Sequence, residues 1–177
     1  MSGINTYEGH TLIPVLKDLR NKYNLDKIIF VADSGLLNND NLTELESLEA
    51  ENFEYIVGSR LKNLPKSLQQ QILSPANYKS VTDSYRIGNF TYQGRKLIVS
   101  YSGKRARKDA HDRLKAIARV EKKLEATKNP KEYLSNYGYK KYLKVTGTSC
   151  IELNTDKIEE DSQWDGLHGV LSNAKDL

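Results

Sequence analysis

A chain of 177 residues, 38% hydrophobic and 28% charged, has the composition of one globular domain and not of a wholly disordered protein. Its 27 Lys and Arg against 23 Asp and Glu give a net charge of +4, which is compatible with a nucleic acid or another polyanion as partner. A single cysteine, Cys150, excludes an internal disulfide, and three scattered histidines lack zinc-site spacing. No apolar run has the length of a membrane span and no signal-peptide pattern is present, so we expect a cytoplasmic protein without a membrane partner.

The first predicted element is an amphipathic helix, Thr11–Tyr23. Pro14 falls in its first turn, where the missing N–H costs no hydrogen bond. Apolar residues recur at helical spacing, so we expect one buried face. That face consists of Leu12, Val15, Leu16, Leu19 and Tyr23.

Ile28–Ala32 is a short, unbroken apolar run rich in β-branched and aromatic residues. Such a run predicts a strand buried on both faces. Asp33 follows at once, and Ser34 and Gly35 form a turn. Ligands of open α/β sheets bind just outside the carboxyl ends of the strands, so Asp33 is a candidate metal ligand or phosphate-transfer carboxylate. The alternative is a turn aspartate that hydrogen-bonds its own backbone.

A second helix, Asn41–Glu51, and a second apolar strand, Phe53–Gly58, follow. The helix has Leu42, Leu45 and Leu48 at its inward positions. This order of elements predicts a parallel pair of strands joined by a crossover helix. Arg60 and Lys62 come after the second strand. Because parallel neighbours end at the same edge, these cations are either solvated or line a phosphate path beside Asp33.

The rest of the chain is rich in predicted strands. Pro65 begins a short helix that ends at Leu73, and Gln93-Gly94 joins two β-rich runs, Arg86–Tyr92 and Arg95–Tyr101, into a hairpin. The later elements are a second hairpin from Tyr142–Val145 and Ser149–Asn154, a short helix Asp156–Gln163, a turn at Trp164-Asp165-Gly166 and a strand Leu167–Leu171. Two central strands are too few for a parallel sheet, so either this part completes the sheet or strands are missing.

Between the hairpins the sequence predicts one long helix, Gly103–Lys128. It has a narrow apolar stripe of Ala106, Ala110, Leu114, Ile117, Val120 and Leu124. Its first turns carry four cations, Lys104, Arg105, Arg107 and Lys108, where the helix dipole disfavours positive charge. These cations are either a solvated face or a patch that contacts phosphates.

Several segments, in this order, resemble the catalytic region of bacterial insertion-sequence transposases of the DDE type, in the subgroup that carries a β-rich insertion. The segments are Asn5-Thr6, TLIPVL, IIFVADSGLLNNDNL, FEYIVGSRLKNL, RKLIVSYSGKRARKDAHDR and WDGLHGVLSN. The resemblance runs from near residue 3 to the C-terminus, and VADSG and YIVGSRLK are its most specific parts.

The resemblance implies an RNase H-like fold whose active site holds two Asp and one Glu around two divalent ions, Mg²⁺ or Mn²⁺. Carboxylates suit these hard cations, and two ions can activate a hydroxyl and stabilise the leaving oxygen. Asp33 matches the second aspartate. The first aspartate and the helix with a Tyr-x-x-Arg-x-x-x-Glu pattern have no counterpart here. We therefore expect a fragment that binds metal weakly and does not transfer DNA strands alone.

The resemblance also divides the chain. It implies an α/β, truncated RNase H-like fold in which residues 1–62 are the central part of the catalytic core, with an open sheet edge. Residues 63–177 are then a β-rich insertion with a long basic helix. The implied partners are double-stranded DNA at transposon ends and a second transposase subunit. The implied contacts are Arg60 and Lys62 to phosphates, Lys104, Arg105, Arg107 and Lys108 to the DNA backbone, and Trp164 to a flipped base or, alternatively, to the interior of the insertion.

Two other classes of function are weighed against this one. The first is a non-catalytic protein that binds DNA or inhibits an intact transposase through its basic helix and Tyr-rich hairpins. The second is a phosphate-accepting or nucleotide-binding α/β domain that uses Asp33. The chain has no glycine-rich phosphate loop, which disfavours the second.

Overall fold

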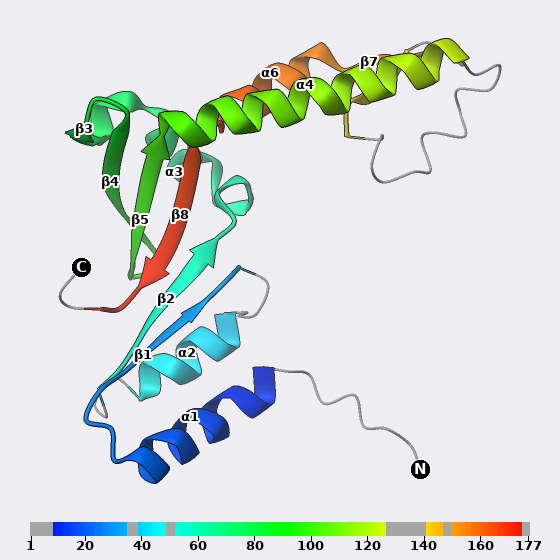
Figure 1. The fold of residues 1–177 in the computed structure, drawn as a ribbon. Coiled ribbons are helices and arrows are strands. Elements are labelled where there is room, and N and C mark those ends of the chain that lie inside the picture. The colour runs from blue at the N-terminus through cyan, green and yellow to red at the C-terminus, as the bar shows by residue number, and fades with distance from the viewer. Residues whose placement is uncertain (1–8, 35–38, 49–51, 127–140, 147–149, 175–177) are drawn as a thin grey trace, which may run out of the picture. The chain divides into compact units, whose positions relative to one another are not determined.

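The computed structural model describes residues 9–34, 39–48, 52–126, 141–146 and 150–174 (Figure 1). The chain divides into two compact units. Unit 1 comprises residues 1–81, 86–100 and 168–177, and unit 2 comprises residues 82–85 and 101–167. The predicted division at residue 62 between core and insertion stays a prediction.

A six-stranded mixed sheet has the order β1-β2-β8-β5-β4-β3. The strands are β1 (Ile28–Ala32), β2 (Phe53–Ser59), β3 (Lys79–Thr82), β4 (Tyr85–Tyr92), β5 (Arg95–Ser102) and β8 (Leu167–Ser172). β1 and β2 are parallel, with Ala32 opposite Val57, which confirms the predicted parallel pair. β8 is antiparallel to β2, with Val57 opposite Leu171. Strands from the later part of the chain therefore complete the sheet.

β1 lies at the edge of this sheet, and among the described strands its one neighbour is β2. Its residues alternate between half-buried and exposed, and Ile29 and Val31 are 51% and 69% exposed. The prediction of a strand buried on both faces is therefore wrong. An apolar run shows that a strand can be buried, but it does not show what lies against its second face.

Two helices lie beside β1 and β2 in unit 1: α1 (Gly9–Tyr23) and α2 (Asn39–Ser47) (Figure 1). In α2 the leucines at 42, 45 and 48 are buried, as predicted. In α1 the predicted burial of Leu16 is confirmed, but Val15, Leu19 and Tyr23 are exposed and Ile13, which was not predicted, is buried. The side chain of Leu12 lies outside the described residues. α1 also begins two residues earlier than predicted, so Pro14 lies inside the helix.

Leucines, valines and aromatic residues form the core of unit 1. Phe53, Tyr55 and Val57 point from β2 into this core, and Leu97 and Val99 of β5 are fully buried. The shorter helices are η2 (Leu61–Asn63), α3 (Lys66–Leu73) and η3 (Pro75–Asn77), and α3 follows Pro65 as predicted. The predicted hairpin of β4 and β5 is confirmed, with positive φ at Gln93 and Gly94 in its turn.

A partly buried ionic cluster joins α2 to two strands of unit 1. Glu46 of α2 accepts hydrogen bonds from Arg95 Nε at 2.6 Å, from Arg95 Nη2 at 3.0 Å and from the Tyr55 hydroxyl at 2.7 Å. The bonds from Arg95 lower the pKa of Glu46 against the opposing effect of burial. Burial, followed by the hydrogen bond to Glu46, raises the pKa of Tyr55. No local pattern predicts this cluster, because Glu46 and Arg95 are 49 residues apart.

Unit 2 contains the long helix α4 (Gly103–Ala126), the hairpin of β6 (Leu143–Thr146) and β7 (Cys150–Leu153), and the short helix α6 (Thr155–Ser162). All four elements were predicted. The predicted end of the long helix after residue 126 and the centre of the second hairpin lie outside the described residues. Val120 of α4 is buried, but Leu114, which was predicted to face inward, is 63% exposed. Asp161 of α6 is buried and accepts a hydrogen bond from the Tyr142 hydroxyl at 3.0 Å.

Candidate metal ligand and DNA-contact residues

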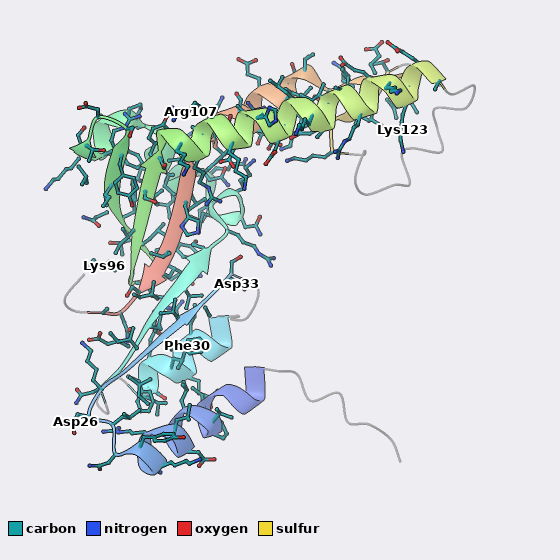
Figure 2. All side chains as sticks on the ribbon, viewed as in Figure 1. Asp26, Phe30, Asp33, Lys96, Arg107 and Lys123 are labelled. Carbon is teal, nitrogen blue, oxygen red and sulfur yellow. The ribbon has the colours of Figure 1, made fainter. Side chains whose placement is uncertain are left out.

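Asp33 lies directly after β1, and its side chain is exposed (Figure 2). Because β1 and β2 are parallel, their carboxyl ends meet at one edge of the sheet. This is the position at which ligands of α/β sheets bind. The carboxylate is therefore held by a strand end and is open to solvent, as a metal or phosphate ligand needs to be.

Gly58 of β2 sets the spacing between the two strand ends. A Cβ atom at this position would lie 2.9 Å from the backbone nitrogen of Ser34 and 3.4 Å from the carbonyl carbon of Asp33. Real Cβ atoms essentially never come within 3.0 Å of a heavy atom outside their own residue and its chain neighbours. A glycine is thus needed for the turn after β1 to pack against β2 and to hold Asp33 where it is.

Arg60 lies beside the same turn. Its Nε donates a long hydrogen bond of 3.4 Å to the Ser34 hydroxyl, and the residue is exposed. Lys62 is exposed in η2, where its carbonyl accepts a hydrogen bond from Gln69 Nε2 at 2.9 Å. The Arg60 guanidinium thus lies beside the turn that follows Asp33, where a cation could contact a phosphodiester.

The metal site that the resemblance implies needs three carboxylates. Within the described ranges no group of three or more His, Cys, Asp or Glu side chains could hold a metal ion. Asp33 is a suitable ligand type, but the described residues do not fit a two-metal centre by themselves. We therefore derive no catalytic step through metal ions for this chain.

The four cations at the start of α4 are exposed in unit 2, and Figure 2 labels Arg107 among them. Arg105 has local partners: its backbone N–H donates to the Ser102 hydroxyl at 3.4 Å, and its Nε lies 3.7 Å from Asp109 Oδ2. The carboxylate of Asp109 offsets part of the positive charge at this helix start. Lys104, Arg107 and Lys108 extend into solvent and are available to an anionic partner.

Trp164 occupies the turn between α6 and β8 and is 8% exposed. Its backbone N–H donates to the Asp161 carbonyl at 3.2 Å. This burial agrees with the alternative in which Trp164 packs in the protein interior and does not stack on a base. In this conformation the indole ring is not available for stacking on a base, so the flipped-base role stays a prediction that requires the turn to open.

The contacts that Ser34 and Gly58 make at the strand ends beside Asp33 were not predicted from the sequence. A glycine at the end of an apolar strand is a recognisable signal of close backbone approach. The contact between Arg60 and Ser34 carries no such signal, because it depends on the register in which β1 and β2 pair.

Comparison with models of known families, with curated proteins and with solved structures gave no match. No helix in the described part of the chain is long and apolar enough to cross a membrane.

Proposed function

We propose that these 177 residues belong to the catalytic region of a DDE-type DNA transposase of a bacterial insertion sequence, with an RNase H-like core. In this proposal Asp33 is one of the three carboxylates of the active site. Arg60 and Lys62 contact phosphates beside it, and the cations at the start of α4 contact the backbone of double-stranded DNA.

One observation carries the proposal: Asp33 stands exposed at the carboxyl end of a parallel strand, with the guanidinium of Arg60 beside its turn. The mixed α/β sheet supports it, because this fold class places functional acids at strand ends. The sequence segments that resemble this family, and the order in which they occur, also support the proposal.

Mg²⁺ or Mn²⁺ would supply Lewis-acid chemistry in a complete site of this family. The described residues contain no group of three ligands. We therefore propose that the 177-residue chain binds DNA but neither cleaves nor joins it. A second subunit or other carboxylates would have to complete the site.

A second candidate function is a DNA-binding or transposase-inhibiting protein without catalysis. The exposed cations at the start of α4 favour it, because DNA contact through them does not need Asp33. The two candidates share DNA as partner and differ in the role of the acid.

The purified chain is expected to bind duplex DNA at 50 mM salt, with an affinity that falls steeply as salt is raised. Fluorescence anisotropy of a labelled duplex measures the binding, and nicking of a supercoiled plasmid with Mg²⁺ or Mn²⁺ measures the cleavage. Asp33→Ala should bind DNA as the parent chain does, and neither protein should nick the plasmid.

Two results would contradict the proposal in different ways. Metal-dependent nicking that Asp33→Ala abolishes would mean that the chain contains a complete active site. Absence of DNA binding at low salt would show that DNA is not the partner and would contradict both candidate functions.

A further inference from the structure

The cations of α4 continue far beyond the start of the helix. Lys104, Lys108, Lys115, Arg119 and Lys122 are all exposed, and we call these five residues the cationic stripe. At 3.6 residues per turn they fall within about 60° of one another around the helix axis, and at 1.5 Å per residue they extend over about 27 Å. Figure 2 labels Arg107 and Lys123, which lie near the two ends of this stretch of α4 but do not belong to the stripe.

Cations outnumber acids along the stripe. The acidic residues of α4 are Asp109, Asp112, Glu121 and Glu125; Asp112 neighbours Lys108 and Lys115, Glu125 neighbours Lys122, and the other two lie further around the helix. In the described part of the chain no ion pair involves any of the five side chains of the stripe. A solvated helix ordinarily mixes both signs on its exposed face, so this segregation of charge points to an anionic partner.

The opposite side of α4 is already occupied within unit 2. Val120 is 2% exposed, Asp109 Oδ2 accepts a hydrogen bond from the Gly166 N–H at 3.0 Å, and Arg113 Nη1 donates to Asp165 Oδ1. These residues lie roughly 120° to 160° around the axis from the centre of the stripe, by the same 3.6-residue turn. The stripe is thus held outward on a helix that its own unit fixes in place.

This arrangement disfavours a membrane surface as the partner. A helix that lies on a membrane needs an apolar face free to enter the lipid beside its cations. Of the large apolar side chains of α4, Val120 is buried, Ile117 and Leu124 are half-buried, and only Leu114 is exposed. A rigid polyanion needs no such face.

The composition of α4 indicates which class of polyanion it can bind. Gly103–Ala126 contains no Phe, Tyr or Trp, so it offers no ring on which single-stranded bases could stack. It also contains no Asn or Gln, the amides that pair with adenine edges, and its arginines bind phosphates as well as guanine. Duplex DNA presents one negative charge per 1.7 Å of axis, or about 16 phosphates over 27 Å, and a line of flexible cations suits this target.

We propose that the cationic stripe is a backbone-tracking surface that binds duplex DNA along α4 without sequence preference. This inference rests on the DNA-binding part of the proposed function and extends it from the first turns to the whole helix. The residues that it adds are Lys115, Arg119 and Lys122.

The test compares two triple variants of the full chain that lose the same charge. The stripe variant is Lys115→Gln/Arg119→Gln/Lys122→Gln, and the control is Lys17→Gln/Lys66→Gln/Lys79→Gln, which alters exposed lysines of unit 1. The stripe variant should bind a 30-base-pair duplex on the order of 10- to 100-fold more weakly at 50 mM salt, with a log–log salt slope flatter by about 3. The control should remain within about threefold of the parent chain.

Further arms separate the alternatives. Lys115→Arg/Lys122→Arg keeps the charge and should keep the affinity, and circular dichroism checks that each variant is folded. An unrelated duplex sequence should compete as well as the original one. Equal binding by the stripe variant and the control would overturn this inference while the proposed function stands, and absence of binding by the parent chain would overturn both. Binding to phosphatidylserine vesicles with no binding to duplex would also contradict it.

Discussion

Replacement of Glu46 by alanine is expected to lower the free energy of unfolding of unit 1 by about 2–3 kcal/mol. The substitution leaves the Arg95 guanidinium and the Tyr55 hydroxyl without their shared acceptor, and the side chain of Arg95 is only 11% exposed. The free-energy cost of a partly buried cation that has lost its partner exceeds the net stabilisation that the ion pair had provided. Urea unfolding followed by hydrogen exchange of β2 peptides measures the change in this unit.

Glu44→Ala is the matched control, because Glu44 lies exposed on the same helix. It should change the free energy of unfolding by less than about 0.5 kcal/mol. Equal effects of the two substitutions would contradict a structural role for the cluster of Glu46, Arg95 and Tyr55.

The same cluster predicts a dependence on pH. Because the hydrogen bonds from Arg95 lower the pKa of Glu46 in the folded state, the unfolded chain takes up this proton first as the pH falls. The contribution of Glu46 to the free energy of unfolding is therefore fully present above its ordinary pKa of 4.5. It is lost as the pH falls from that value through the lower pKa of the folded state. The difference in stability between the parent chain and Glu46→Ala should shrink as the pH falls from about 5 to 3. A difference that stays constant over this range would contradict the account.

Replacement of Arg113 by alanine is expected to lower the free energy of unfolding of unit 2 by about 2–3 kcal/mol. Arg113 and Asp165 are both largely buried, and their hydrogen bond joins α4 to the turn before β8. That bond raises the pKa of Arg113 against the opposing effect of burial. The chain has one tryptophan, Trp164, and its fluorescence reports the unfolding of this unit.

Arg119→Ala removes an exposed arginine from the same helix and should leave the transition within about 0.5 kcal/mol of the parent chain. Asp165→Ala alone should destabilise unit 2 about as much as Arg113→Ala, by about 2–3 kcal/mol, and the double variant should cost far less than the sum. Additive effects would show that the two side chains act independently.

Most of the elements could be predicted from the sequence, because each has a local signal. Gln93-Gly94 between two β-rich runs predicts the hairpin, and the order of helices and strands predicts the parallel pair of β1 and β2. The apolar spacing of Leu42, Leu45 and Leu48 predicted the buried face of α2 correctly.

Errors arose where distant parts of the chain decide the outcome. The five apolar residues of β1 suggested burial on both faces, but the strand lies at the sheet edge. In α1 the apolar pattern fits more than one face, and the structure buries Ile13 and places Arg20 over the ring of Phe53. Neither outcome can be read from a local pattern, because it depends on the neighbours that the fold supplies.

The candidate site divides in the same way. Parallel pairing of β1 and β2 predicts that Asp33 and the residues after β2 end at one edge of the sheet, whereas the contacts of Ser34 and Gly58 required the register of the strands. The sequence drew attention to the cations at the start of α4. That Lys115, Arg119 and Lys122 extend this row of cations depends on which side of α4 packs against its unit, and the sequence alone does not show this.

The nucleotide sequence on both sides of this reading frame tests the central claim most directly. If the chain belongs to a DDE transposase, an Asp-bearing strand should be encoded upstream and a Tyr-x-x-Arg-x-x-x-Glu helix downstream, in one frame or another. Finding both would make Asp33 the second carboxylate of that site. If neither is encoded in any frame, the transposase proposal is contradicted, and DNA binding by the cationic stripe alone would have to account for the protein.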